Sequence, residues 1–392
     1  DLAMALRRIE VSRLSMKSAQ AGYYPKVGVS AGWTKERSSG LLNGPNGRGR
    51  NSSYFDIGAS LSWEIDLFGR INSQVKEKKA ELRATRAEAE GVRLSVAAEI
   101  ATQYIQIRTW QAELAIARNH IARQEKVVKI TEARKEAGLG SGLEVAQAKV
   151  VYYSTQASIP ILENSIATGI NSLSVLVGEF PPAVKASLTD DYQLPSYLHI
   201  IDPGTPRDLL RRRPDIIQAS EELSAQVEAV GIAKKDFLPT LTINGQIGTG
   251  AHRMNDLFHS QSLTYSIEPT ISWTIFDGFS RKYNVAIARQ QLESQVENYN
   301  LTALTAVEEV ENALSSYQAS VEHIKTIEQV IVQADKSLEF SVDLYKRGLN
   351  PFTDVVSAQL NCLEYQEEAV EAKGQALNYL ITLYKALGGG WQ

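Results

Sequence analysis

An internal duplication is the feature that most constrains what this chain can fold into. When the 392-residue sequence is shifted by 210 positions, it matches itself in one register from Ile57 to Gly178. The matched pairs include Trp63 with Trp273, Gly138 with Gly348 and, upstream at a shift of 214, Pro25 with Pro239. Solenoid repeats are about 20–50 residues long. The chain is therefore predicted to hold two copies of one larger unit.

Four segments, two in each copy, alternate strictly between apolar and polar residues: 26–33, 54–63, 240–247 and 264–273. A period of two predicts strands with one apolar and one wet face. Two interpretations stay open, a soluble sheet with one face on a core and a transmembrane barrel. Lengths near the ~9–11 residues of a membrane strand favour the barrel. Aromatic residues at the strand ends and the long polar loops 34–53 and 249–263 favour it too.

The number of strands limits how such a barrel could close. Four strands are too few, because the smallest membrane barrels have about eight. Open strand edges are not tolerated in lipid. If these strands span a membrane, two or more chains must share one barrel. Two chains would give a lumen filled by side chains, and three would leave room for a water-filled channel.

Each strand pair is followed by a long stretch without proline, 71–137 or 281–347. As a helix, each would be about 100 Å long. Apolar residues recur every seven positions, which predicts coiled-coil packing. The series are Ile100, Ile107, Leu114, Ile121 and Val128, then Val310, Tyr317, Ile324, Ile331, Leu338 and Tyr345. A glycine turn and a return helix, 143–177 or 352–387, complete each copy. A conduit of helices and a plain coiled-coil stalk both fit this pattern.

These elements predict a first repeat over 1–178, an irregular connector over 179–206 and a second repeat over 207–392. Each repeat is a helix, a strand pair and a helical hairpin. The connector holds Pro181, Pro182, Pro195, Pro203 and Pro206.

Composition and motifs exclude several functions. The 41 basic and 45 acidic residues nearly balance, which removes the basis for general nucleic-acid binding. The single cysteine, Cys362, excludes a disulfide framework and a cysteine-based zinc site. No catalytic signature is present, so we predict no enzyme, no cofactor and no metal. The loop with His252 and His259 is interpreted as ordinary solvated structure, and Arg211–Arg213 as a structural ion-pair cluster.

Three segments carry a resemblance to a known family. Residues 203–216 (PGTPRDLLRRRPDI), 383–391 (LYKALGGGW) and 140–148 (GSGLEVAQA) resemble signatures of the outer-membrane factors of Gram-negative tripartite efflux systems, the TolC-like channels. The resemblance implies an α+β fold in a homotrimer. Its 12-stranded transmembrane β-barrel, with four strands per chain, would continue into a long periplasmic α-helical barrel. A mixed equatorial domain, including the connector, would surround the helices.

The same resemblance implies a function. Members are passive gated ducts in the outer membrane that export drugs or other small toxic compounds. They contact outer-membrane lipid, a periplasmic adaptor (membrane fusion) protein and an inner-membrane RND-type pump. A polypeptide secretion duct shares this architecture and remains the alternative, followed by a structural stalk. Many members carry an N-terminal lipidated cysteine, which would lie upstream of Asp1, so lipidation stays open.

The resemblance also implies a gate at the periplasmic helix tips. Asp354 matches an acidic ring position, Glu144 an acidic tip position and Tyr345 a tyrosine of the closing network. Ser357 and Asn350 replace a second acid and a basic partner, so closure is expected to rest on packing, with Phe352 as an apolar plug. The alternative is that Glu144 and Asp354 are acids favoured by helix dipoles. The turns expected to dock the adaptor comprise Gly138, Leu139, Gly140, Ser141, Gly142, Gly348, Leu349, Asn350 and Pro351.

Overall fold

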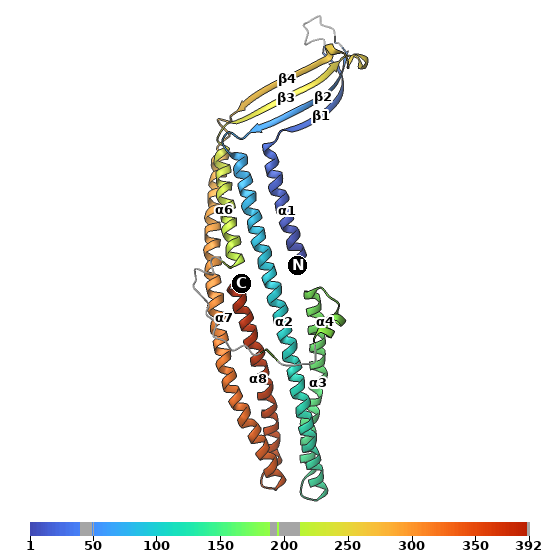
Figure 1. Ribbon diagram of the computed structural model, residues 1–392, viewed down its shortest axis with the longest axis vertical. Helices are drawn as coiled ribbons and strands as arrows, with labels where there is room; N and C mark the ends of the chain where they lie inside the picture. The colour runs from blue at the N-terminus through green and yellow to red at the C-terminus, as the bar shows by residue number, and fades with distance from the viewer. Residues whose placement is uncertain (40–48, 50, 189–193, 196–211, 390–392) are drawn as a thin grey trace. The chain divides into compact units, whose positions relative to one another are not determined.

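The computed structural model describes residues 1–39, 49, 51–188, 194–195 and 212–389. Contacts within the chain define two compact units, each drawing on both halves of the sequence. The sheet unit comprises residues 3–89 and 215–302, and the hairpin unit comprises residues 90–214 and 303–392. The predicted repeats, 1–178 and 207–392, therefore each contribute to both units. Figure 1 shows the elements of the two units along the chain.

The sheet unit contains one antiparallel sheet in the order β1-β2-β3-β4 (Figure 1). Its strands are β1 (Lys26–Arg37), β2 (Asn51–Ile65), β3 (Thr240–Ala251) and β4 (Leu263–Ser272). The first three are longer than predicted, because the ladder continues through polar residues as far as Arg37 opposite Asn51. Main-chain pairing does not require apolar side chains, so the polar ends stay in the sheet.

The register places the alternating residues of all four strands in common rows. Leu61 lies opposite Val27 on one side and Gly245 on the other, whereas Ser62 lies opposite Lys26 and Asn244. The predicted apolar and polar faces are therefore continuous across the sheet.

No core covers the apolar face of the described sheet. Val29 is 80% exposed and Ile267 is 75% exposed. The interpretation as a sheet packed on a soluble core is wrong for this reason. Within the described residues, β1 and β4 each pair along one edge only, so both outer edges keep unpaired main-chain groups.

The duplication is visible in the hydrogen bonds that join strands to helices. Trp63 at the end of β2 donates its indole N–H to the Tyr23 carbonyl at 2.9 Å. Trp273 after β4 donates in the same way to the Phe237 carbonyl at 3.0 Å. Tyr23 follows α1 (Leu2–Gln20), and Phe237 follows α6 (Pro214–Lys235). These are the helices that precede the two strand pairs. The same bond therefore fixes the same junction in both repeats.

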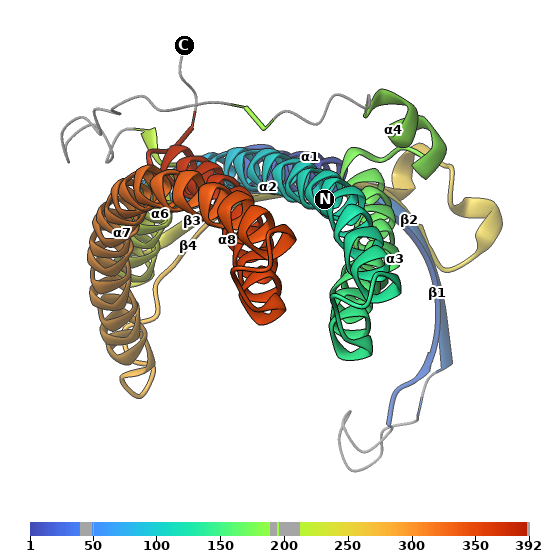
Figure 2. The same cartoon turned by 90° about the horizontal axis from the view of Figure 1, so that it is seen from below.

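Two helices of 67 residues, α2 (Arg70–Glu136) and α7 (Ser280–Lys346), follow the strand pairs. The return helices are α3 (Gly142–Val177) and α8 (Phe352–Ala386). In the hairpin unit, α3 runs beside α2 and α8 beside α7 (Figure 2). The predicted heptad residues face inward, and Ile107 and Tyr317 are buried in separate apolar clusters. Of the described helices, none is both long and apolar enough to cross a membrane.

The connector contains a short helix, α4 (Pro181–Ser187), where irregular structure was expected. That prediction was wrong because proline suits the first turn of a helix, where its fixed φ is already helical. Val184 of α4 packs into a core with Ile107 and Ile170, which holds the helix in place. Connector residues 189–193 and 196–206 lie outside the described residues.

Arg213, the last residue of the arginine cluster, has a structural role. Arg213 is buried, ion-pairs with Glu309 of α7 at 2.7 Å and donates to the Ala386 carbonyl of α8 at 2.8 Å. This confirms the ion-pair interpretation for Arg213. Arg211, like the signature residues 203–210 and 390–391, lies outside the described residues.

Candidate gate at the hairpin tips

The two hairpin turns have the same main-chain geometry. In the first, the Leu139 amide donates to the Arg134 carbonyl and the Gly138 amide to the Lys135 carbonyl. In the second, Leu349 donates to Leu344 and Gly348 to Tyr345. Each pair of bonds caps the preceding long helix, with φ of 73° at both Gly138 and Gly348. The turns expose Leu139 and Leu349, which are 67% and 71% accessible.

Glu144 is fixed at the start of α3 by a capping box. The Ser141 hydroxyl accepts from the Glu144 amide, and the Glu144 carboxylate accepts from the Ser141 amide, both at 3.3 Å. The position of Glu144 in the first turn of α3 therefore fits the interpretation as an acid favoured by the helix dipole. The same carboxylate oxygen also accepts from another hairpin, so the cap is not its only contact.

That second contact joins the two hairpins. The Tyr345 hydroxyl near the end of α7 donates to Glu144 Oε2 at 2.9 Å. Burial of the ring, together with the Glu144 hydrogen bond, raises the pKa of Tyr345 to about 12. Tyr345 therefore stays protonated and keeps its donor throughout the physiological pH range. The structure brings together these two residues, which the sequence analysis assigned to the gate.

Phe352 is buried beside the Tyr345 ring and faces no opening within the described chain. Its ring is 5.0 Å from the Tyr345 ring, and the side chain is 2% exposed. It belongs to a core that includes Val127 of α2, Ala148 of α3 and Val355 of α8. A plug must project into an opening, so the expected role of Phe352 is corrected to packing between the hairpins of one chain. An aromatic residue at a helix start can face either way, which sequence alone does not resolve.

The remaining predicted gate residues lie apart from this core. Asp354 and Ser357 are exposed and one turn apart on α8, whereas Asn350 is half-buried in the second turn. Asp354 lies in the first turn of α8, so the helix-dipole interpretation also fits it.

Arg134 near the end of α2 is a residue that sequence reasoning missed. Its guanidinium lies 4.8 Å from the centre of the Tyr345 ring and donates to two main-chain carbonyls, Lys346 at 2.9 Å and Leu139 at 3.1 Å. Asn350 supplies no positive charge to the second turn, but the Arg134 guanidinium reaches that turn from α2. The only sequence signal was a basic residue in the last turn of α2.

Other candidate features do not form a site. His252 bonds to the Ser53 carbonyl, and His259 lies 3.7 Å from Asp256. Among the described residues, no group of three or more His, Cys, Asp or Glu side chains is placed to hold a metal ion. Cys362 is fully buried and donates to Asp335 at 3.1 Å, and burial raises the pKa of its thiol to about 12.

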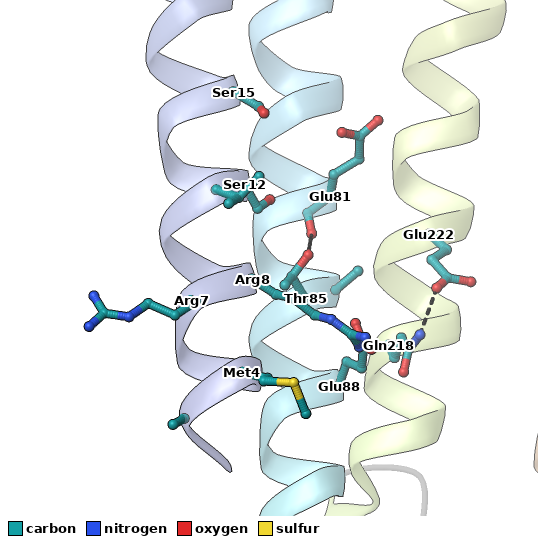
Figure 3. Close-up of a pocket in the computed structure, with 13 residues that line it drawn as sticks. Met4, Arg7, Arg8, Ser12, Ser15, Glu81, Thr85, Glu88, Gln218 and Glu222 are labelled. Carbon is teal, nitrogen blue, oxygen red and sulfur yellow. Dashed lines mark hydrogen bonds and ion pairs between the residues drawn. The ribbon is translucent and has the colours of Figure 1, made fainter. Parts of the chain in front are cut away.

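A groove of about 840 Å³ lies in the sheet unit between α1, α2 and α6 (Figure 3). Several of its polar side chains already bond to a neighbour. Arg8 ion-pairs with Glu88 at 2.9 Å, and Gln218 donates to Glu222 at 2.8 Å. The first contact joins α1 to α2 and the second lies within α6, so neither side chain is free to hold a ligand.

Together, an open sheet with one exposed apolar face and helical hairpins linked at their tips define a class of channel-forming envelope protein. The comparisons with known proteins give the family. Residues 1–179 and 205–389 match the model of the outer membrane efflux protein family, and the chain belongs to that family. It is an outer-membrane duct for efflux in Gram-negative bacteria, with its helical part in the periplasm.

Individual relatives are similar along the whole chain. The outer membrane protein OprJ of Pseudomonas aeruginosa is 27% identical over 100% of this chain and 81% of its own length. The toluene efflux pump outer membrane protein TtgF of Pseudomonas putida is 26% identical, over 100% and 81%. The solved structure of VceC from Vibrio cholerae superposes with a TM-score of 0.90 at 27% identity, covering 100% of this chain and 93% of VceC.

Proposed function

We propose that three copies of this chain form one channel with a 12-stranded transmembrane barrel. The main support for this proposal is the sheet, which has an exposed apolar face and two open edges. Because the strands alternate in direction from β1 to β4, β4 of one copy can continue the antiparallel ladder on β1 of the next. Three copies supply twelve strands, enough for a water-filled lumen. The apolar face would then contact outer-membrane lipid.

In this proposal the hairpins of three chains form a periplasmic helical barrel, and the connector belongs to an equatorial belt around it. The duct is passive. An inner-membrane RND-type pump supplies the energy, and a periplasmic adaptor links pump and duct. Relatives are named for the efflux of toluene, solvents and antibiotics and for the export of pyoverdine. Small toxic compounds are therefore the proposed cargo.

The proposed gate is at the hairpin tips. The Tyr345–Glu144 hydrogen bond joins α7 to α3 within each chain, and three copies of the exposed Asp354 carboxylate surround the axis. A ring of like charges favours cations over anions by focusing the field. The exposed turns at 138–142 and 348–351 are the adaptor surface. An adaptor that binds these turns better in the open state would shift the gate toward opening.

Two measurements on one detergent-solubilised preparation test the assembly. Light scattering corrected for detergent is expected to give the mass of three chains, and planar bilayers are expected to show discrete conductance steps. A mass of one chain without conductance would contradict the proposal. Drug sensitivity of a deletion strain separates small-molecule efflux from polypeptide secretion. Only efflux predicts that the deletion makes the cells hypersensitive and that the intact gene restores their resistance.

A further inference from the structure

We propose that Arg134 is the clasp that holds the two hairpin tips of one chain together and so keeps the gate closed. This inference rests on the proposed gate. It concerns a residue on α2 that the predicted gate residues do not include.

Three contacts made by one side chain carry the proposal. One guanidinium nitrogen donates to the Lys346 carbonyl at the end of α7 and another to the Leu139 carbonyl in the turn after α2. The charged plane also lies 4.8 Å from the Tyr345 ring centre. A helix C-terminus leaves carbonyls without intrahelical partners and carries partial negative charge, so a cation there is favoured twice.

The contacts connect elements far apart in the sequence. Arg134 and Lys346 are 212 positions apart, and the bond links the end of α2 to the end of α7. Tyr345 in turn donates to Glu144 on α3. Arg134 therefore supports the ring whose hydroxyl makes the second link between the hairpins. When the clasp is removed, the Tyr345 ring loses the cation above it, and α7 loses a bond to its last residue.

The planar fork of arginine is needed, because two carbonyls in different directions are bonded at once. Lysine at this position would keep the charge but reach one carbonyl at a time. Arg134→Lys should therefore fall between the natural protein and Arg134→Met, which keeps the stem and removes the charge. Lys135→Met is the matched control, since it removes one positive charge from the adjacent, exposed position on the same helix.

Two readouts on the detergent-solubilised assembly test the clasp. The first is hydrogen–deuterium exchange of the peptide covering 340–352. We expect exchange about tenfold faster in Arg134→Met, smaller acceleration in Arg134→Lys and none in Lys135→Met. A tenfold change corresponds to about 1.4 kcal/mol. The second readout is conductance in planar bilayers, where Arg134→Met should open the channel more often than Lys135→Met does.

The outcomes separate the clasp from the gate. If Arg134→Met exchanges at the rate of Lys135→Met, the clasp is overturned. If exchange rises but neither Arg134→Met nor Tyr345→Phe changes conductance, the clasp stands and the proposed gate location fails. If Tyr345→Phe raises conductance and Arg134→Met does not, the gate stands and Arg134 has no part in closing it.

Discussion

The Tyr345 hydroxyl of α7 donates a 2.9 Å hydrogen bond to the Glu144 carboxylate of α3, and these residues lie 201 positions apart in the chain. The same carboxylate caps its own helix through Ser141. One acidic side chain thus serves local helix structure and the contact between hairpins. Substitutions at the two ends of this bond should therefore have different effects.

Removing the hydroxyl alone tests the contact between hairpins. Tyr345→Phe keeps the buried ring and the cap, and loses a hydrogen bond to a charged group, worth about 1.5–3 kcal/mol. We expect a larger single-channel conductance or open fraction in planar bilayers. Tyr153→Phe, an exposed tyrosine on α3, is the control. Equal conductance of the two variants would argue against a closing role for Tyr345.

Asp354 tests the charge of the constriction. Asp354→Ala would remove three carboxylates from the axis of a trimer, so cation preference and conductance should both change. Reversal potentials under a salt gradient measure the preference. Ser357→Ala, one turn further on α8, changes no charge and should leave the reversal potential as it was. If Asp354→Ala also leaves it unaltered, Asp354 is not at the constriction.

Phe352 tests the correction from plug to packing. Phe352→Ala would leave a cavity in the core under Tyr345 and should lower the free energy of unfolding by about 3–5 kcal/mol. Thermal unfolding of the hairpin helices, followed by circular dichroism, measures the loss. Leu349→Ala, exposed in the adjacent turn, should change stability by less than about 0.5 kcal/mol. A plug with no packing role predicts the opposite, with open channels and unchanged stability.

The half-buried Glu113 predicts how stability depends on pH. Burial, with Glu367 and Glu371 of α8 nearby, raises the pKa of Glu113 on α2 to about 7. Since the folded state binds this proton more tightly than the unfolded chain does, its stabilising contribution is full below about pH 4.5 and is lost as pH rises through 7. The melting temperature should therefore fall between pH 5.5 and pH 8. Glu113→Gln should reduce that fall, and an identical pH profile would contradict the assignment.

Sequence periodicity predicted the strand faces and the inward helix stripes, and the physical reason is local. A period of two fixes the face of each residue whatever the partner strand, so Leu61 and Ser62 were assigned correctly before the register was known. Capping is local as well, which is why the turns at Gly138 and Gly348 were found from their glycines.

The misses have a common cause in long-range contacts. Arg134 bonds to main-chain carbonyls. Every residue has a carbonyl, so no residue type in the sequence marks the partner of Arg134. Phe352 was assigned to an opening because its sequence position does not say which neighbours bury it. The short helix α4 depends on Val184 entering a core formed by residues of α2 and α3.

The open edges of the sheet have a genetic consequence. In the proposed trimer, each chain relies on its neighbours to complete the ladder along β1 and β4. A copy with a disrupted edge would be taken into assemblies with intact copies and would spoil them. In a cell that expresses both, the defective gene should therefore act dominantly, and its severity should grow with the share of defective chains.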